Sequence, residues 1–288
     1  HQEDFVPAGL LFIFDTGLNE EHLQEDLVSI IDIVKEAVEA EAYNILLEKD
    51  IYLEGIAEHI NNILDIVFHL NILSLDMPYL LYTFFNNEEI YVTYEALQAV
   101  DYEGDFDNIY EIINIVEKVL VENLGLVTVN DVLALEISME NRTLLSNANV
   151  HAVLDIVAEV INLELLSVLY EPAYGRIEFG SKMEPFMGLV DISEYEAPLL
   201  VEDLNNILSA VHELVDLNVL GFALFEEELD WANSSAVSNL VETIFGLNYV
   251  RVKTDDIITF VSENVYDIST IKASQLDLAA DGLLIGEA

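Results

Sequence analysis

An apolar phrase recurs along this chain and limits the folds that it can adopt. Residues 61–76 read NNILDIVFHLNILSLD, and residues 205–221 read NNILSAVHELVDLNVLG. Related hexapeptides are SIIDIV at 29–34, EIINIV at 111–116, AVLDIV at 152–157 and, more weakly, NLVETI at 239–244. Their apolar residues are three and four positions apart, which is the spacing of a helix with one buried face. The phrase therefore predicts repeated amphipathic helices.

The clearest predicted helix covers residues 107–125. Its sequence is DNIYEIINIVEKVLVENLG, and residues 204–215 repeat its apolar spacing. Asp and Asn side chains favour the position just before a helix, where their oxygen accepts a backbone N–H bond. We therefore expect Asp107 or Asn108 to cap the first of these helices and Asp203 to cap the second.

The ends of the predicted helices share a pattern. A large apolar residue is followed by Asn or Gly and then by another apolar residue: Leu70-Asn71-Ile72, Leu124-Gly125-Leu126, Ile161-Asn162-Leu163, Leu217-Asn218-Val219 and Phe245-Gly246-Leu247. Gly and Asn enter the left-handed conformation at low cost and so end helices, and the next apolar residue packs back on the last turn. This shared ending favours true repeats over a chance likeness of Ile- and Leu-rich helices.

Between the helices lie stretches that are β-prone or suit a second helix. They are EEIYVTY, LVTVND, YGRIEFG and YVRVKTDDIITFV, and the intervals between copies of the phrase vary from 33 to 54 residues. A strict superhelix holds its period more closely. The sequence predicts a mainly α fold, an irregular array or bundle of repeated amphipathic helices with short β hairpins or hooks between them. We expect an N-terminal extension at 1–22 and helical-repeat halves at 23–150 and 151–288, which can also form one continuous domain.

The charge of the chain constrains its partners. It has 55 Asp and Glu against 9 Lys and Arg, a formal net charge of −46, yet 53% of its residues are hydrophobic. Disordered acidic chains lack such an apolar fraction, so we expect a folded protein with a carboxylate surface. That surface excludes direct binding to nucleic acid, which needs Lys and Arg. It also repels itself, and salt, divalent cations, low pH or a basic partner must offset the repulsion.

The sequence also bears on localisation. It has no Cys, and no apolar run reaches the roughly 18 residues of a membrane span. Its first residue is His1 and not Met. Either a leader segment has been removed or the sequence is part of a longer chain. We expect an extracellular or cell-surface protein.

Two segments carry a resemblance to a known group of proteins. YEGDFDNIYEIINIVEKVLVENLGL at 102–126 and ASQLDLAADGLLI at 273–285 resemble segments of very large, repetitive, acidic surface proteins of low-GC, often wall-less bacteria. The two segments cover about an eighth of the chain. The resemblance implies a surface setting and a repeat architecture, and it implies no catalytic residue.

One acidic loop is a candidate metal site. DYEGDFD places Asp101, Glu103, Asp105 and Asp107 at alternate positions before the clearest predicted helix. Ca²⁺ takes six to eight oxygen ligands, so this loop is a candidate calcium site, although its spacing departs from an EF-hand. The alternative is a solvated loop whose last Asp caps the helix.

A second acidic run is a candidate interaction site. FEEELDW places Glu226, Glu227 and Glu228 near Trp231, the single Trp of the chain. Trp is enriched at the centres of protein interfaces, so Trp231 is a candidate anchor for a partner. Packing in the core is the alternative for Trp231, and a solvated face is the alternative for the acids.

Common catalytic motifs are missing. The chain has no HExxH, GxGxxG, GxxxxGK[ST] or GxSxG pattern. We therefore expect no enzyme, but a non-catalytic extracellular structural or interaction protein, a repeat module or subunit of a larger surface assembly. Its expected partners are copies of itself or neighbouring repeat modules, with Ca²⁺ as the candidate cofactor. The alternatives are an acidic decoy or chaperone that binds a basic partner, as a DNA mimic does, and a salt-adapted enzyme.

Overall fold

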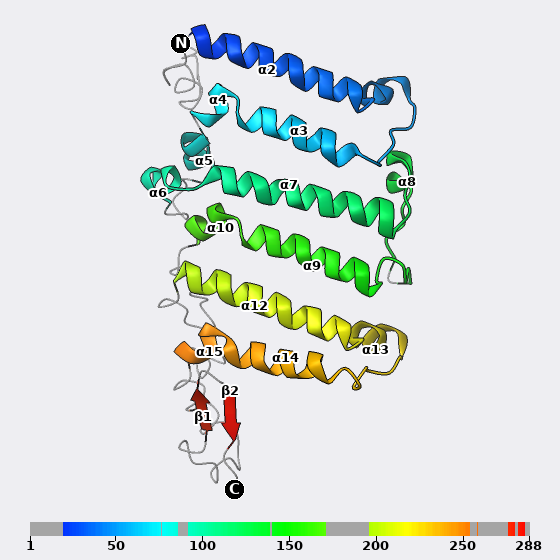
Figure 1. Cartoon of the computed structure of the whole chain (residues 1–288), viewed down its shortest axis with the longest axis vertical. Helices are drawn as coiled ribbons and strands as arrows, with labels where there is room; N and C mark the ends of the chain where they lie inside the picture. The colour runs from blue at the N-terminus through cyan, green and yellow to red at the C-terminus, as the bar shows by residue number, and fades with distance from the viewer. Residues whose placement is uncertain are drawn as a thin grey trace, which may run out of the picture. The chain divides into compact units, whose positions relative to one another are not determined.

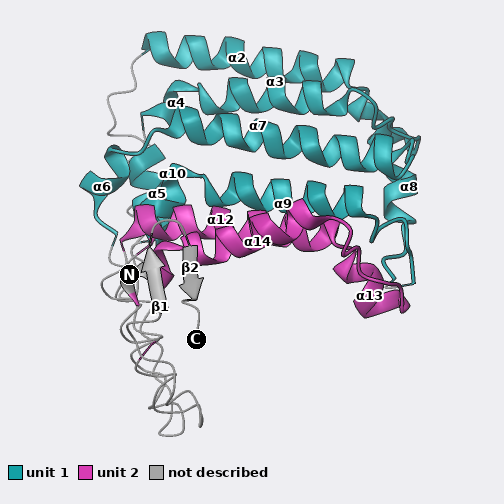
Figure 2. Cartoon of the chain, turned by 60° about the horizontal axis from the view of Figure 1, so that its bottom comes forward, with its two compact units in different colours: residues 1–169 teal, residues 170–288 magenta. Residues whose placement is uncertain are grey.

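The computed structural model describes residues 20–75, 77–85, 92–138, 140–170, 196–253, 258 and two short strands near the C-terminus. It is mainly helical, with 74% of the interpretable residues in helices, which confirms the predicted class. The chain divides into two compact units, residues 1–169 and residues 170–288 (Figure 2). The boundary expected at 150 and 151 falls inside the helix Asn147–Ile161, so the division lies after that helix.

Unit 1 contains two helical hairpins. The first consists of α2 (Glu20–Glu39) and α3 (Ile56–Phe68), and the second consists of α7 (Tyr102–Lys118) and α9 (Asn147–Ile161). The four helices lie side by side in chain order, because α3 packs on α7 (Figure 1). Shorter elements connect them: η1 (Ala42–Leu47), α4 (Asn71–Ser74), α5 (Met77–Phe85), α6 (Tyr94–Gln98), η2 (Val119–Asn123) and α8 (Val129–Leu133). Helix α10 (Glu164–Leu169) follows α9.

The turns of these two hairpins are joined by backbone hydrogen bonds. The N–H of Leu53 donates to the carbonyl of Val127 over 3.0 Å, and the N–H of Val129 donates to the carbonyl of Ile51 over 2.9 Å. Ile51 and Leu53 are buried, and the largest fully buried side chain among the described residues is Leu97. A single layer of helices encloses few such positions, which leaves many apolar side chains partly exposed.

Unit 2 contains a third hairpin. Its helices are α12 (Ala197–Asp216) and α14 (Ser234–Gly246), with α13 (Val219–Phe225) in the turn and α15 (Asn248–Val252) after α14. Strands β1 (Leu276–Ala279) and β2 (Gly282–Ile285) form an antiparallel pair with Leu276 opposite Ile285.

A buried aspartate closes each hairpin. Asp26, Asp105 and Asp203 lie in the first helix of their hairpins, and the carboxylate of each accepts two consecutive backbone N–H groups just after the second helix. Asp26 accepts from Asn71 over 2.7 Å and from Ile72 over 3.1 Å. These N–H groups start a short helix, so the carboxylate also meets the positive end of a helix. We call this contact the carboxylate clamp.

The first and third hairpins repeat these contacts at the same sequence separation. The clamp spans 45 residues from Asp26 to Asn71 and 45 residues from Asp203 to Asn248. Asn71 and Asn248 also donate side-chain bonds to Glu25 and Glu202, 46 residues away in each case. In the middle hairpin the clamp from Asp105 to Glu164 spans 59 residues. The three hairpins are therefore copies of one structural unit.

The clamp corrects the predicted helix starts. α7 begins at Tyr102 with Asp101 as its cap, where the Asp101 carboxylate accepts the Gly104 N–H over 3.4 Å. Asp107 and Asn108 lie inside that helix. Asp203 lies inside α12, which begins at Ala197. These predictions were wrong because a polar residue before an apolar run was taken to cap its own helix. Asp203 instead caps a helix that is distant in the sequence, as Asp105 does in the middle hairpin.

The predicted left-handed helix ends are confirmed at two positions only. Gly125 has φ 65° and Asn218 has φ 60°. Asn71 instead begins α4, Asn162 has φ −82°, and Gly246 is the last residue of α14. At these three places the chain passes directly into a short helix that the clamp caps, so no left-handed residue is required.

The short β hairpins expected between the helices are not seen. The stretch LVTVND leads into α8, which begins with a capping box of Thr128 and Asp131, and YVRV lies in α15. Thr93 of EEIYVTY caps α6. The stretch YGRIEFG, residues 88–91 and residues 1–19 lie outside the described residues. The β-branched residues in these stretches favour strands locally. Helix caps and tertiary packing outweigh that preference, so the described parts of these stretches cap or form helices.

We predict that Asp105→Ala lowers the free energy of unfolding by about 1–3 kcal/mol, because two N–H groups at the start of α10 lose a charged acceptor. Burial raises the pKa of the Asp105 carboxyl, and the two backbone bonds oppose that shift. Asp107→Ala is the matched control, since Asp107 is exposed two residues away, and we expect it to stay within about 0.5 kcal/mol of the unsubstituted protein. Urea unfolding followed by circular dichroism measures both. Equal effects of the two substitutions would contradict the clamp.

Candidate interaction surface

Helix α2 has apolar residues on two faces. One face carries Asp26, Ile33 and Glu36, and through Asp26 and Glu36 it bonds to α4 and α3. The other face carries side chains that are between 51% and 61% exposed: Leu23, Leu27, Ile31, Val34 and Val38. We call these five residues the outer stripe. A soluble helix normally leaves such a stripe open only where another surface meets it.

Three of the same five positions of α7 bond to or stack on residues at α3. When α2 and α7 are aligned on Asp26 and Asp105, the outer stripe corresponds to Tyr102, Phe106, Tyr110, Ile113 and Glu117. Phe106 stacks on Phe68 of α3 with ring centroids 3.8 Å apart. Glu117 accepts the N–H groups of Gly55 and Ala57, over 2.8 and 2.5 Å, at the start of α3.

Tyr110 adds a polar contact to this interface. Its hydroxyl donates to the Asp65 carboxylate of α3 over 3.4 Å, and burial together with that carboxylate raises the pKa of Tyr110 to about 12. The α3–α7 interface thus shows what a first helix of this kind does with its second face: it receives the second helix of the preceding hairpin. Among the described residues, no helix covers the outer stripe of α2 well enough to bury its side chains.

Helix α14 has the position in the third hairpin that α3 has in the first. In α3 the face toward α7 includes Asn61, which donates to Asn114 of α7 over 2.8 Å, and Asp65. The matching residues of α14, at the spacing that the clamp sets, are Ser238 and Glu242, and both are exposed. Val241 lies between them and is 48% exposed.

The DYEGDFD residues take separate roles. Asp101 caps α7 and Asp105 forms the clamp, whereas Glu103 and Asp107 are exposed. Within the described part of the chain, the possible metal ligands that lie close together are three other residues, Glu36, Glu39 and His59. Calcium binding at DYEGDFD therefore stays a prediction.

The FEEELDW residues lie in the turn of the third hairpin. The Asn218 side chain donates to the Glu227 carboxylate and to the Glu228 carbonyl, both over 3.2 Å. The Asn218 side chain lies close to Gly221: an added Cβ there would lie 2.4 Å from the Asn218 Oδ1 atom, so this side chain would have to shift. Glu226 adopts a left-handed conformation with φ 57°. Trp231 is 69% exposed, so it is not part of a core, and its role as a partner's anchor stays a prediction.

Carboxylates crowd together between α7 and α9. Burial raises the pKa of Glu159, and the nearby charges of Glu111 and Asp155 raise it further. Asp131 shows the opposite effect, because bonds from Thr128 and Val127 lower its pKa. The surface is thus uneven: some carboxylates are held by donors, and others repel their neighbours.

Sequence reasoning missed the outer stripe. Its signal is present in residues 23–38, where LQEDLVSIIDIVKEAV places apolar residues on both faces of one helix. A helix that buries one face against a single neighbour needs only one such stripe. The second apolar stripe of α2 could therefore have been predicted from the sequence as a surface for a second contact.

The helices were also tested as membrane spans. No single described helix has the length and apolar composition to cross a membrane, although α12 and α13 together, bent by 62°, meet both criteria as a pair.

Comparisons with protein-family models, with characterised proteins and with solved structures find no match to this chain.

We predict that Glu159→Gln stabilises the protein at pH 7 by about 0.2–0.5 kcal/mol, the size of a like-charge pair one helical turn apart such as Asp155 and Glu159. The pKa of Glu159 is higher in the folded protein than its usual 4.5, so the folded state holds this proton at pH values where the unfolded chain has lost it. The contribution of Glu159 to stability therefore falls as the pH rises above about 4.5, and the gain from Glu159→Gln should disappear near pH 4. Urea unfolding at both pH values tests this, with exposed Glu136→Gln as the control. A gain that does not depend on pH would refute the assignment.

Proposed function

We propose that this chain is a non-catalytic structural module of a helical-repeat assembly at the cell surface, which grows by adding hairpins of its own kind. One observation carries the proposal: α2 exposes the five apolar side chains of the outer stripe at the positions where α7 receives α3. In repeat proteins each unit buries a face on its neighbour, so an end unit with an apolar outer face requires a further unit or a polar cap.

We assign α14 of a second copy as the helix that covers the outer stripe. The α3–α7 contact supplies the template, in which Phe68 of α3 stacks on Phe106 of α7. In the proposed contact Phe245 of α14 takes the place of Phe68 and Leu27 takes the place of Phe106. Such a contact joins different surfaces of two identical chains, so it is head-to-tail and leads to open chains instead of closed pairs.

The energy of this contact balances two large effects. Burying a Leu or Ile side chain fully contributes about 1.5–3 kcal/mol, and the outer stripe is already partly covered, so each residue supplies a fraction of that. Two chains of formal charge −46 repel each other. Salt reduces the range of this repulsion from about 10 Å at 0.1 M to about 3 Å at 1 M. Self-association should therefore strengthen with salt, and Ca²⁺, the proposed cofactor, would act in the same direction.

We predict that the mass of the full chain increases between 0.1 and 1 M NaCl in size-exclusion chromatography with light scattering. The double substitution Leu27→Glu and Ile31→Glu should keep the protein monomeric in both, because it places two charges in the outer stripe. Val241→Glu should do the same from the opposite surface. The control is Leu133→Glu with Ile137→Glu, which adds the same charges at other exposed apolar positions and should leave association unchanged.

A mixing experiment identifies the geometry of the contact. Each blocked variant keeps one intact surface, α14 in the Leu27→Glu and Ile31→Glu protein and α2 in the Val241→Glu protein. An equimolar mixture at 1 M NaCl should therefore form dimers and nothing larger. A monomeric wild-type protein under all these conditions would rule out self-association and direct attention to basic partners.

A further inference from the structure

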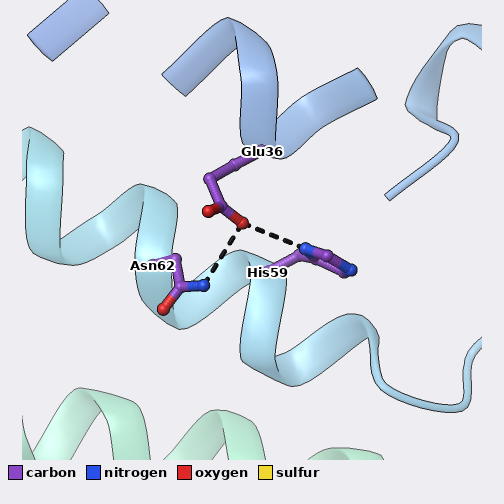
Figure 3. A network of polar contacts seen from close by, with 3 residues as sticks. All are labelled: Glu36, His59 and Asn62. Carbon is purple, nitrogen blue, oxygen red and sulfur yellow. Dashed lines mark hydrogen bonds and ion pairs between the residues drawn. The ribbon is translucent and has the colours of Figure 1, made fainter. Parts of the chain in front are cut away.

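The structure brings together three side chains that no sequence motif connects. Glu36 and Glu39 lie on α2, and His59 lies on α3. Their possible ligand atoms all lie within 4.8 Å of one another. Figure 3 shows the centre of the group: one oxygen of Glu36 lies 3.0 Å from the Nδ1 atom of His59 and also accepts the Asn62 side-chain N–H over 3.2 Å.

A comparison with the other hairpins shows which contacts of this group belong to the repeated hairpin structure and which do not. Glu213 and Asn239 repeat the Glu36–Asn62 bond in the third hairpin, 26 residues apart in both cases. In that hairpin, however, Ala236 occupies the position of His59. When the hairpins are aligned on the first clamped N–H group, Ala152 occupies the same position in the middle hairpin. Ala236 is 1% exposed. The contact between the two helices of a hairpin therefore does not need an imidazole at this position.

We propose that Glu36, Glu39 and His59 bind a divalent transition-metal ion of the Zn²⁺ class. Zinc is bound by His nitrogen at about 2.0–2.1 Å and by carboxylate oxygen at about 2.0–2.2 Å, so two donors on a tetrahedral ion lie about 3.3 Å apart. The 3.0 Å between Glu36 and His59 is close to that distance. A carboxylate has several lone pairs, so Glu36 can keep Asn62 as a partner while it binds the ion.

The surroundings of the group favour a cation. His59 and Glu39 line a cavity of about 240 Å³ together with Glu41 and Glu54, which adds two further carboxylates. The cavity opens to solvent, so water can complete the coordination. Two carboxylate ligands also balance the charge of a divalent ion, whereas an ion pair with a protonated His59 would balance only one of them.

The imidazole selects the kind of ion. Ca²⁺ and Mg²⁺ take oxygen ligands, whereas His is a good ligand for Zn²⁺ and its neighbours in the periodic table. This site is therefore distinct from the calcium site predicted at DYEGDFD. It joins α2 to α3, so a bound ion would hold the helix that carries the outer stripe. The inference does not depend on self-association, because all three ligands come from one chain.

Isothermal titration of the chelator-treated full chain with ZnCl₂ in excess CaCl₂ tests the site. Excess Ca²⁺ occupies exposed carboxylates, and we expect one Zn²⁺ per chain to bind above that background. His59→Ala and Glu39→Gln should each weaken this binding more than about 10-fold. His59→Ala should fold, since Ala stands at this position in the other hairpins, and far-ultraviolet circular dichroism checks that.

His69→Ala is the matched control for the titration. His69 lies directly after the helix that carries His59 and pairs with Asp65 over 3.4 Å, but with one carboxylate and in an exposed setting. It should leave the Zn²⁺ affinity unchanged, and the ring signals of His59, not those of His69, should shift in proton NMR when one equivalent of Zn²⁺ is added. Absence of stoichiometric binding, or an equal loss in His59→Ala and His69→Ala, would overturn the proposal.

Discussion

The carboxylate clamp is the contact on which this architecture depends. A helical hairpin has a covalent turn at one end and two free helix ends at the other, and the clamp ties that open end together. It does so with a buried charge, which is costly to remove from water unless it meets several donors. In all three hairpins two backbone N–H groups and the positive end of the short helix offset part of that cost, and at Asp105 burial still raises the pKa of the carboxyl.

The sequence predicted much of this fold and missed the contact that closes it. Amphipathic spacing identified the helices, and the recurring phrase identified copies of one unit, because both follow from local geometry. The clamp is a contact between residues 45 or more positions apart, and Asp203 before an apolar run looks the same whether it caps its own helix or another. The group of Glu36, Glu39 and His59 was unpredictable for the same reason, since it requires the register of α2 against α3.

The surface of the protein combines strong repulsion with open apolar contacts. A net charge of −46 opposes any association, and the outer stripe of α2 favours it. These opposing effects make the solution conditions decisive, because ions weaken the first effect and leave the second nearly unchanged. Crowded carboxylates such as Glu159 add the same sensitivity to folding itself. The proposed self-association should therefore depend on the ions around the protein.

The clamp also bears on how such a chain can change over time. It joins the two ends of a hairpin whatever the length of the chain between them, 45 residues in two hairpins and 59 in the other. Insertions in the turn are therefore tolerated at little cost, since loop closure depends weakly on length. A gene segment that encodes one hairpin carries both halves of its own closure. Its duplication or loss as a whole would change the number of hairpins and would leave no clamp half made.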